Sequence, residues 1–394
     1  MTSEWRTIRA ADFIDFNPRL SLKKGDIATK VAMDKLKPFT KKIPETEKAE
    51  FNGGAKFCNG DTVMARITHC LENGKTAYVD MLDDGEIGFG STEFIVMRAK
   101  TGISDPQFVY YTAISPVFRN VAIKSMVGSS GRQRVQQSVL EELELSVPDL
   151  EEQRRIGAFL ARIDEKIALN DRINDNLEQQ AQSYFQELFV DNANPEWTTG
   201  TISDLGAVVG GSTPSKAKPE YYTESGIAWI TPKDLSINKS KFVSHGENDI
   251  TELGLKNSSA AIMPEGTVLF SSRAPIGYIA IAAGEVTTNQ GFKSVVPKPE
   301  IGTPFVYFFL KNTLPVIEGM ASGSTFKEVS GSTMKNVPAV IPDAETLAKF
   351  SDFCAPIFAQ QRILEEQNQS LATLRDNLLP KLMSGEIDVS AVQL

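Results

Sequence analysis

The chain has 394 residues, 41% of them hydrophobic and 23% charged, so it can bury a core in two or three domains and is not a disordered segment. The net charge of −9 argues against a loose polycationic nucleic-acid binder, and any DNA-binding face must be a local patch. Two histidines, three cysteines without a CxxC pair and the lack of a long apolar run lead us to expect no metal, no membrane contact and a reducing cytoplasm.

The first predicted segment, at 1–149, contains both helices and strands. Short β-rich runs at 62–66 and 94–98 are separated by turn signals such as Asn73-Gly74. One helical stretch follows near 106–126. Residues 150–190 are then predicted to form a long helix.

The second segment repeats this order. The sequence Leu-Ser-Val-Pro-Asp at 145–149 matches Ala-Val-Ile-Pro-Asp at 339–343, an offset of 194 residues, and the offset grows to 205 towards the N-terminal side. The chain is therefore a duplication whose halves differ by loop insertions. We predict an α+β fold in which a second globular segment and a second long helix follow the first, with boundaries at 191–343 for the segment, 344–382 for the helix and 383–394 for a C-terminal tail.

Both long helices carry the same heptad pattern. Its seam positions include Ile156, Ile163, Ile167, Asn174 and Leu177 in the first helix, and Ile357, Leu364, Asn368 and Leu371 in the second. The two asparagines hold the same register position, and a buried Asn commonly fixes the register of a coiled coil. With pseudo-twofold symmetry the helices would pack antiparallel; the alternative is an ordinary amphipathic surface helix. Pro356 is expected to kink the second helix or mark its start, and Pro380 to end it.

Enzyme motifs are missing from the sequence. It has no GxxxxGK[ST] loop, no GxGxxG after a strand, and no run of Asn or Asp, two prolines and an aromatic as in DNA amino-methyltransferases. Asp149 with Asp164, Glu165 and Lys166 loosely resembles a metal nuclease, but 164–166 lie on the heptad helix and are interpreted as a solvated face. His69 and Cys70 would point to opposite faces of a strand. We predict no catalytic residue, metal or cofactor in this chain.

Loops rich in hydrogen-bond donors recur at matching places in the two segments, with the side chains that pair with base edges and phosphates. In the first segment the candidate DNA-binding residues are Arg66, Thr68, Asn73, Lys75, Ser91, Thr92, Ser129, Ser130, Arg132, Gln133 and Arg134. In the second they are Ser212, Thr213, Ser215, Lys216, Thr231, Lys233, Ser272, Arg273, Asn289, Gln290, Ser324, Thr325 and Lys327. Each loop alone could be an ordinary polar loop, but the recurrence favours DNA, and Ser-Ser-Gly-Arg-Gln-Arg at 129–134 is the best single candidate.

Over nearly its whole length the sequence resembles the specificity (S) subunits of type I restriction–modification systems. In the first segment the resemblance rests on Gly-Asp-Thr-Val-Met-Ala-Arg-Ile-Thr (60–68) and Gly-Ser-Thr-Glu-Phe (90–94). In the second it rests on Ile-Ala-Trp-Ile-Thr-Pro-Lys-Asp-Leu (227–235) and Thr-Thr-Asn-Gln-Gly-Phe (287–292). The start of the first helix also matches the family, whereas the start of the second lacks the Glu-Gln pair and departs from it.

The resemblance implies a non-catalytic subunit that reads a bipartite double-stranded DNA target, with one target recognition domain per half-site. Its conserved spacer helices would set the gap and dock two methyltransferase (M) subunits. S-adenosylmethionine is then expected in the M subunits, and ATP and Mg²⁺ in motor-nuclease (R) subunits. Two alternatives stay open, namely a coiled-coil scaffold whose globular segments bind protein and a DNA-modifying enzyme with unrecognised motifs.

Overall fold

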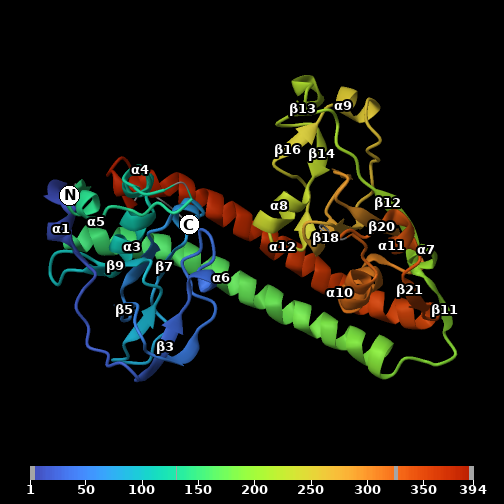
Figure 1. The fold of residues 1–394 in the computed structure, drawn as a ribbon, viewed down its shortest axis with the longest axis horizontal. Coiled ribbons are helices and arrows are strands. Elements are labelled where there is room, and N and C mark those ends of the chain that lie inside the picture. Colours follow the sequence, from blue (N-terminus) through green and yellow to red (C-terminus); the bar gives the residue numbers. More distant parts are fainter. Residues whose placement is uncertain (1–4, 130, 324–326, 390–394) are drawn as a thin grey trace. The chain divides into compact units, whose positions relative to one another are not determined.

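The structure is a computed structural model that describes residues 5–129, 131–323 and 327–389. It divides into two compact units, of which the first joins Met1–Leu169 with Gln367–Leu394 and the second is Asn170–Glu366. Each unit therefore contains one globular region and a stretch of each of two long helices, α6 (Leu150–Gln186) and α12 (Ala344–Met383). Figure 1 draws α6 in green and α12 in red.

Three small sheets build the described part of the globular region of the first unit. An antiparallel ribbon joins its two ends, with β1 (Arg6–Arg9) against β10 (Glu144–Val147). An antiparallel sheet has the order β2 (Ile14–Phe16), β9 (Phe94–Ala99), β6 (Thr62–Ala65) and β7 (Thr76–Tyr78). A second sheet, mixed because β3 and β8 are parallel, has the order β4 (Glu47–Glu50), β3 (Ile27–Val31), β8 (Gly88–Gly90) and β5 (Ala55–Phe57).

The helical stretch predicted at 106–126 is two helices, α3 (Pro106–Ile114) and α4 (Pro116–Lys124). Ser115 separates them because its side chain accepts the Phe118 N–H and so caps a new helix that starts at Pro116. Buried side chains of α3 pack against the first half of α6 in one core cluster. The unit's remaining helices are short: α1 (Ala10–Phe13), η1 (Met33–Lys35), α2 (Thr68–Glu72) and α5 (Gln137–Glu141).

The globular region of the second unit repeats this plan, as the predicted duplication requires. Its ends pair as β11 (Thr198–Thr201) and β21 (Pro338–Ile341). Its two larger sheets have the orders β12 (Gly206–Gly210), β20 (Lys293–Pro297), β17 (Val268–Ser272), β18 (Ile276–Ala282), β15 (Phe242–Val243), and β13 (Tyr222–Thr223), β16 (Asn248–Ile250), β14 (Ile227–Ile230), β19 (Thr287–Thr288). Its helices are η2 (Glu187–Asp191), α7 (Ile202–Leu205), η3 (Pro219–Tyr221), α8 (Pro232–Ile237), α9 (Glu252–Lys256), α10 (Thr303–Gly319) and α11 (Gly331–Lys335).

The two long helices run antiparallel in each unit. In the first unit Asp164 pairs with Arg375, and further along α6 the Ile167 carbonyl accepts from Asn368, which lies earlier in α12. Among the seam positions Ile156, Ile163, Ile357 and Leu364 are buried, and Ile167, Leu177 and Leu371 pack at the edges of the two main core clusters. In the second unit Asn174 and Gln361 each donate to the other's backbone carbonyl, at 3.5 and 3.2 Å.

Neither proline of α12 marks an end of the helix, so the prediction that Pro380 ends it is wrong. The helix begins at Ala344, continues through Pro356 and ends at Met383, beyond Pro380. A proline removes one backbone donor and crowds the preceding turn. Burial of Cys354, Ile357 and Phe358 on the inner face compensates for that loss around the first proline.

The contacts of Gln153 at the start of α6 explain why the Glu152-Gln153 pair has no counterpart in α12. Gln153 is fully buried, accepts the Asp105 N–H at 3.0 Å and donates to the Ile103 and Pro148 carbonyls. It thereby holds the loop that leads into α3. The equivalent position, 194 residues later, is Leu347, which is buried in the apolar core of the second unit instead.

Asp164 does not lie on a solvated face. Its carboxylate accepts from the Tyr111 hydroxyl at 2.6 Å and from Arg375 Nη1 at 2.7 Å, and both charged side chains are almost fully buried. Burial alone would lower the pKa of Arg375, but the charges of Asp164 and Asp376 and their hydrogen bonds raise it. The pair is a charged contact between α6 and α12 inside the first unit.

We predict that Arg375→Met destabilises the first unit by about 3–5 kcal/mol, because it leaves the Asp164 carboxylate buried without a counter-charge. The double variant Asp164→Asn/Arg375→Met should be closer to the parent, since Asn keeps an acceptor for Tyr111. The free energy of unfolding in urea measures both effects. Arg155→Met, which removes an exposed ion pair with Glu152, should cost less than about 1 kcal/mol; an equal cost at Arg375 would contradict the prediction.

Candidate nucleic-acid interface

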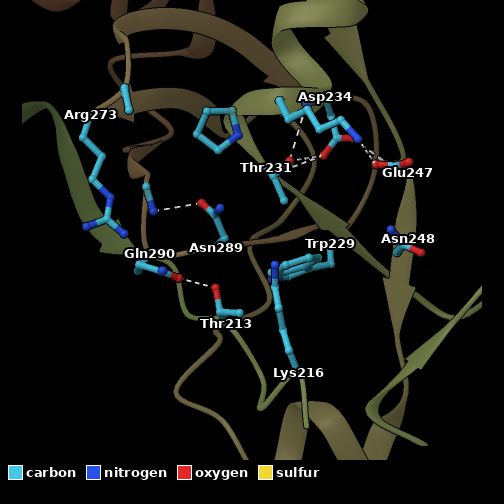
Figure 2. A pocket seen from close by; sticks show the side chains of 14 residues that line it. Thr213, Lys216, Trp229, Thr231, Asp234, Glu247, Asn248, Arg273, Asn289 and Gln290 are labelled. Carbon is cyan, nitrogen blue, oxygen red and sulfur yellow. Dashed lines mark hydrogen bonds and ion pairs between the residues drawn. The ribbon is translucent and has the colours of Figure 1, made fainter. Parts of the chain in front are cut away.

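Many of the predicted residues of the second unit line one pocket with a volume of about 490 Å³ (Figure 2). The segments that supply them follow β12, β14, β17 and β19, so strands far apart in sequence bring their ends together. We call this the second-unit pocket; its lining residues are Thr213, Lys216, Trp229, Thr231, Pro232, Lys233, Asp234, Glu247, Asn248, Arg273, Ala274, Asn289, Gln290 and Gly291. Seven of the predicted DNA-binding residues are among them: Thr213, Lys216, Thr231, Lys233, Arg273, Asn289 and Gln290.

The acidic side chains of the pocket are engaged within the protein. Asp234 Oδ2 accepts from the N–H and the hydroxyl of Thr231, both at 2.7 Å, and its Oδ1 accepts the Glu247 N–H at 2.9 Å. Thr231 and Asp234 thus form the capping box of α8. Glu247 pairs with Lys233 at 2.6 Å, which raises the pKa of that lysine. Asp234 was not predicted from the sequence, although Thr-x-x-Asp is the signature of such a cap.

Two amide side chains lie at the end of β19. The side-chain oxygen of Asn289, Oδ1, accepts the Gly291 N–H at 2.8 Å, and the side-chain oxygen of Gln290, Oε1, accepts from the Thr213 hydroxyl. Gln290 is exposed and Asn289 is half-buried. Because both side-chain oxygens accept hydrogen bonds within the protein, the NH₂ groups are the remaining polar groups of Asn289 and Gln290.

The other predicted residues of the second unit have different surroundings. Ser272 is buried, and its hydroxyl donates to the Gly291 carbonyl at 3.0 Å, so it supports the loop. The Ser212 carbonyl accepts from the Trp229 indole at 3.0 Å. Ser215 and Lys327 are exposed. Ser324 and Thr325 lie outside the described residues.

Three of the predicted loops of the first unit also meet. The Val135 N–H donates to the Arg66 carbonyl at 2.8 Å, and Thr68 exchanges hydrogen bonds with the backbone of Gln133. Arg134 forms a two-point ion pair with Glu93, with contacts of 3.0 and 2.6 Å. We call residues 66–68, 91–93 and 127–135 the first-unit loop cluster. Arg132 is exposed at its surface, whereas Thr68 and Arg134 are held by the protein.

Several remaining candidates of the first unit serve the fold. Lys75 Nζ donates to the Met33 carbonyl at 2.9 Å, and the Ser91 hydroxyl accepts the Glu93 N–H at 3.1 Å. Asn73 ends α2 and is exposed, as are Thr92 and Ser129; Ser130 lies outside the described residues. His69 and Cys70 belong to α2, so the prediction that they point to opposite faces of a strand is wrong.

Equivalent ion pairs with exchanged charges hold the loops in the two units. The Val329 N–H donates to the Ser272 carbonyl at 2.9 Å, which repeats the Val135–Arg66 bond of the first unit. In the second unit the acidic residue of the pair lies on the loop before α11, where Glu328 faces Arg273 at 3.6 Å and Lys293 at 3.9 Å. Glu93 and Glu328 were not predicted from the sequence, and only their fixed spacing from the matched motifs could have pointed to them.

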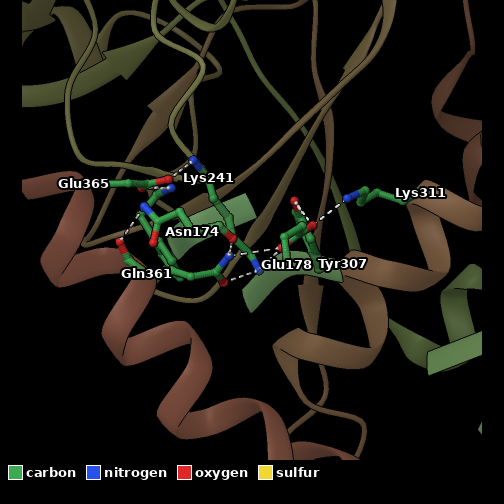
Figure 3. A network of polar contacts seen from close by, with 8 residues as sticks. Asn174, Glu178, Lys241, Tyr307, Lys311, Gln361 and Glu365 are labelled. Atoms are coloured by element: carbon green, nitrogen blue, oxygen red, sulfur yellow. Dashed lines mark hydrogen bonds and ion pairs between the residues drawn. The ribbon is translucent and has the colours of Figure 1, made fainter. Parts of the chain in front are cut away.

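A buried lysine anchors the globular region of the second unit to its helices (Figure 3). Lys241 Nζ donates to Glu178 at 2.8 Å and to Gln361 at 2.9 Å, and Glu178 also accepts from Tyr307 and Lys311. Glu178 belongs to α6 and Gln361 to α12. The first unit has a counterpart in Lys41, which is buried against the rings of Tyr78, Tyr110 and Tyr111.

The lysine charges of this network and the burial of Glu178 shift the pKa of that carboxylate in opposite directions. Burial alone would raise the pKa of Glu178, but the charges and hydrogen bonds of Lys241 and Lys311 outweigh it and lower the pKa to about 2. Its ordinary value is 4.5. Since the folded-state pKa is the lower one, Glu178 stabilises the fold above about pH 4.5, and this stabilisation is lost as the pH falls towards 2.

Glu178→Gln should therefore destabilise the second unit by about 3 kcal/mol at pH 7, because Lys241 and Lys311 lose their counter-charge. The deficit should shrink as the pH falls from 4.5 towards 2, where the parent loses the same interaction. Thermal melts of both proteins across this range measure it. Glu265→Gln, which breaks an exposed pair with Arg362, serves as the control, and a deficit that is independent of pH would count against the assignment.

Two kinds of feature are absent from the residues that the structure describes. No helix among them is long and apolar enough to cross a membrane. Within the same described ranges, no group of three or more His, Cys, Asp or Glu side chains is placed to hold a metal ion.

Comparison with known proteins yields specificity subunits of type I restriction enzymes among the relatives of this chain. The chain is 39% identical to the type I restriction enzyme MjaIX specificity subunit of Methanocaldococcus jannaschii over 47% of its own length and 45% of that protein's. It is 24% identical to the HindI specificity subunit of Haemophilus influenzae over 80% of its length and 84% of that protein's. The crystal structure of the type I restriction-modification S subunit from M. genitalium shares the fold, with a TM-score of 0.58, 18% identity and 96% of each chain covered.

A family model extends these similarities over most of the sequence. The model for the type I restriction modification DNA specificity domain matches twice, at residues 3–179 and 194–374. Each match includes one globular segment and most of the long helix that follows it. The chain therefore belongs to the type I restriction–modification DNA specificity family.

Proposed function

We propose that this chain is the non-catalytic DNA sequence-recognition subunit of a type I restriction–modification complex. Each globular region reads one half of a bipartite double-stranded DNA target. The observation that carries this proposal is the twofold recurrence of a loop-built, donor-rich surface within a chain that matches the DNA specificity domain twice. As a DNA-reading subunit of such a complex, the chain acts in the cytoplasm.

The chemistry of the loops supports DNA as the ligand. The second-unit pocket presents amide NH₂ groups and the cations Lys216 and Arg273, while its acids Asp234 and Glu247 are held by protein donors. Such a surface matches phosphate oxygens and the acceptors of base edges. A local patch of this kind is compatible with the net charge of −9.

We propose the following organisation for the chain. Target recognition domains occupy 1–149 and 191–343, conserved spacer helices occupy 150–190 and 344–382, and a tail occupies 383–394. The helices dock two M subunits, which bind S-adenosylmethionine and methylate adenine after flipping it out of the duplex. R subunits, where they join the complex, supply ATP- and Mg²⁺-dependent DNA cleavage.

Methylome sequencing of cells with and without the chain tests this function. A bipartite methylation motif should be present only when the chain is produced together with its M subunits. The purified chain alone should transfer no methyl group from S-adenosylmethionine to DNA. Methyl transfer by the partner-free chain would favour the enzyme alternative, and a motif that persists without the chain would refute the proposal.

We also predict that Arg132→Ala changes the DNA binding of the assembled complex, because Arg132 is an exposed cation of the first-unit loop cluster, whereas the exposed Arg134 is paired with Glu93. A base-reading role costs about 1–3 kcal/mol and relaxes one position of one half-site, whereas a phosphate contact weakens all sequences and lowers the salt slope by about 1. Binding titrations at several salt concentrations separate the two roles.

Two further variants make this test specific. The triple variant Arg132→Ala/Gln133→Ala/Arg134→Ala also removes the ion pair with Glu93 and should have the larger effect. Arg6→Ala, on β1, removes an exposed cation outside the cluster and should leave binding unchanged. If the triple variant binds and methylates like the parent, the cluster is an ordinary surface; if no complex binds DNA sequence-specifically, the scaffold alternative is favoured.

A further inference from the structure

The backbone around Asn289 is built to hold one side chain in one place. Its N–H donates to the Ile230 carbonyl at 3.0 Å, and its carbonyl accepts the Phe292 N–H at 3.3 Å. A Cβ atom at Gly211 would come within 2.0 Å of the Asn289 carbonyl oxygen, and one at Gly291 within 2.9 Å of its Oδ1. The backbone at Gly211 and Gly291 therefore approaches so closely that the position of Asn289 is fixed before any ligand binds.

The orientation of the Asn289 amide follows from its bond to the backbone. Its Oδ1 accepts the Gly291 N–H at 2.8 Å. A backbone N–H can only donate, so the oxygen must face Gly291 and the NH₂ group must be the other end. Among the residues that the structure describes, this NH₂ group has no hydrogen-bond partner, although Asn289 lines the second-unit pocket between Gln290 and Thr231 (Figure 2).

The surroundings of this NH₂ group add donors. Gln290 has its oxygen bound by Thr213, and Arg273 and Lys216 line the same pocket. The nearby carboxylate of Asp234 is filled by three hydrogen bonds from Thr231 and Glu247. A ligand group next to the Asn289 NH₂ therefore meets donors and must itself supply an acceptor, while Glu247, the other acid of the pocket, is paired with Lys233.

Guanine is the base whose major-groove edge fits this demand best, because thymine presents only one acceptor, O4, beside its methyl group. The guanine edge carries two acceptors, N7 and O6, and no donor. Adenine is recognised by Asn or Gln through a donor and an acceptor together, whereas the acceptor of Asn289 is already engaged by Gly291. Cytosine presents a donor and would face the NH₂ group unfavourably.

We propose that Asn289 is a specificity-determining residue that donates to a guanine in the half-site read by the second unit. This inference rests on the proposed function, because it assumes that the pocket faces DNA. It adds the identity of the base and the atom that reads it.

The variant Asn289→Asp tests the inference most sharply. Either oxygen of Asp can accept the Gly291 N–H, so the loop keeps its anchor, but the end that faces the DNA becomes an acceptor. The preference at one position should move from guanine to cytosine or adenine, which carry donors. Asn289→Ala removes the group and should weaken discrimination at that position roughly 10- to 100-fold.

The assembled complex with its M subunits is measured on a pool of duplexes randomised at the half-sites, and the methylation motif is sequenced in parallel. Asn312→Asp makes the same chemical change on the exposed face of α10 in the same unit and should keep the parent motif. The half-site of the first unit should be the same for all four proteins.

Three results would overturn the inference. The first is an unchanged motif with unchanged discrimination in both Asn289 variants. The second is an equal loss of binding at every sequence, which indicates a phosphate contact. The third is a parent motif without guanine in the half-site of the second unit. A parent complex that shows no sequence preference at all refutes the proposed function itself, so the two failures are distinguishable.

Discussion

The pairing of α6 with α12 is the constraint on which both units depend. Each unit closes its core only when a stretch of one helix packs antiparallel against a stretch of the other, and the two stretches are far apart in sequence. Apolar seam residues supply most of the burial, and each unit adds its own polar contacts, Asp164 with Arg375 in the first and Asn174 with Gln361 in the second. Buried polar contacts of this kind fix the register of helices, because a shifted register would leave them unpaired.

The loops that face outward depend in turn on these anchored units. Within each unit an ion pair ties the C-terminal loop to the ends of neighbouring strands, through Arg134 and Glu93 in the first unit and through Glu328 and Arg273 in the second. The backbone bonds beneath them are equivalent, but the signs of charge are exchanged. A recognition surface can therefore change its side chains between copies of the repeat while the loop positions are kept. The same exchange means that a single loop transplanted between the copies would bring like charges together.

The sequence predicted the large elements and missed the local ones for physical reasons. The heptad pattern recurs at an offset of 194 residues and is carried by many side chains, so single exceptions do not obscure it. The duplication and the helix pair could therefore be predicted. The break at Ser115 and the continuation of α12 through Pro356 depend on a cap and on tertiary packing. In the same way, residue type alone cannot tell a hydroxyl that caps a helix or supports a loop, as those of Thr231 and Ser272 do, from one that is free.

The shared helices also impose an order on synthesis. The first unit needs the α12 residues that follow Gln367, so its core stays open while the ribosome makes the whole of the second unit. Domains usually fold as they emerge, the N-terminal one first. Here the apolar face of the first half of α6 must wait, and it is exposed to chaperones and to wrong partners during that time. A slow codon stretch or a chaperone contact placed between the two units would therefore affect the yield of the first unit more than that of the second.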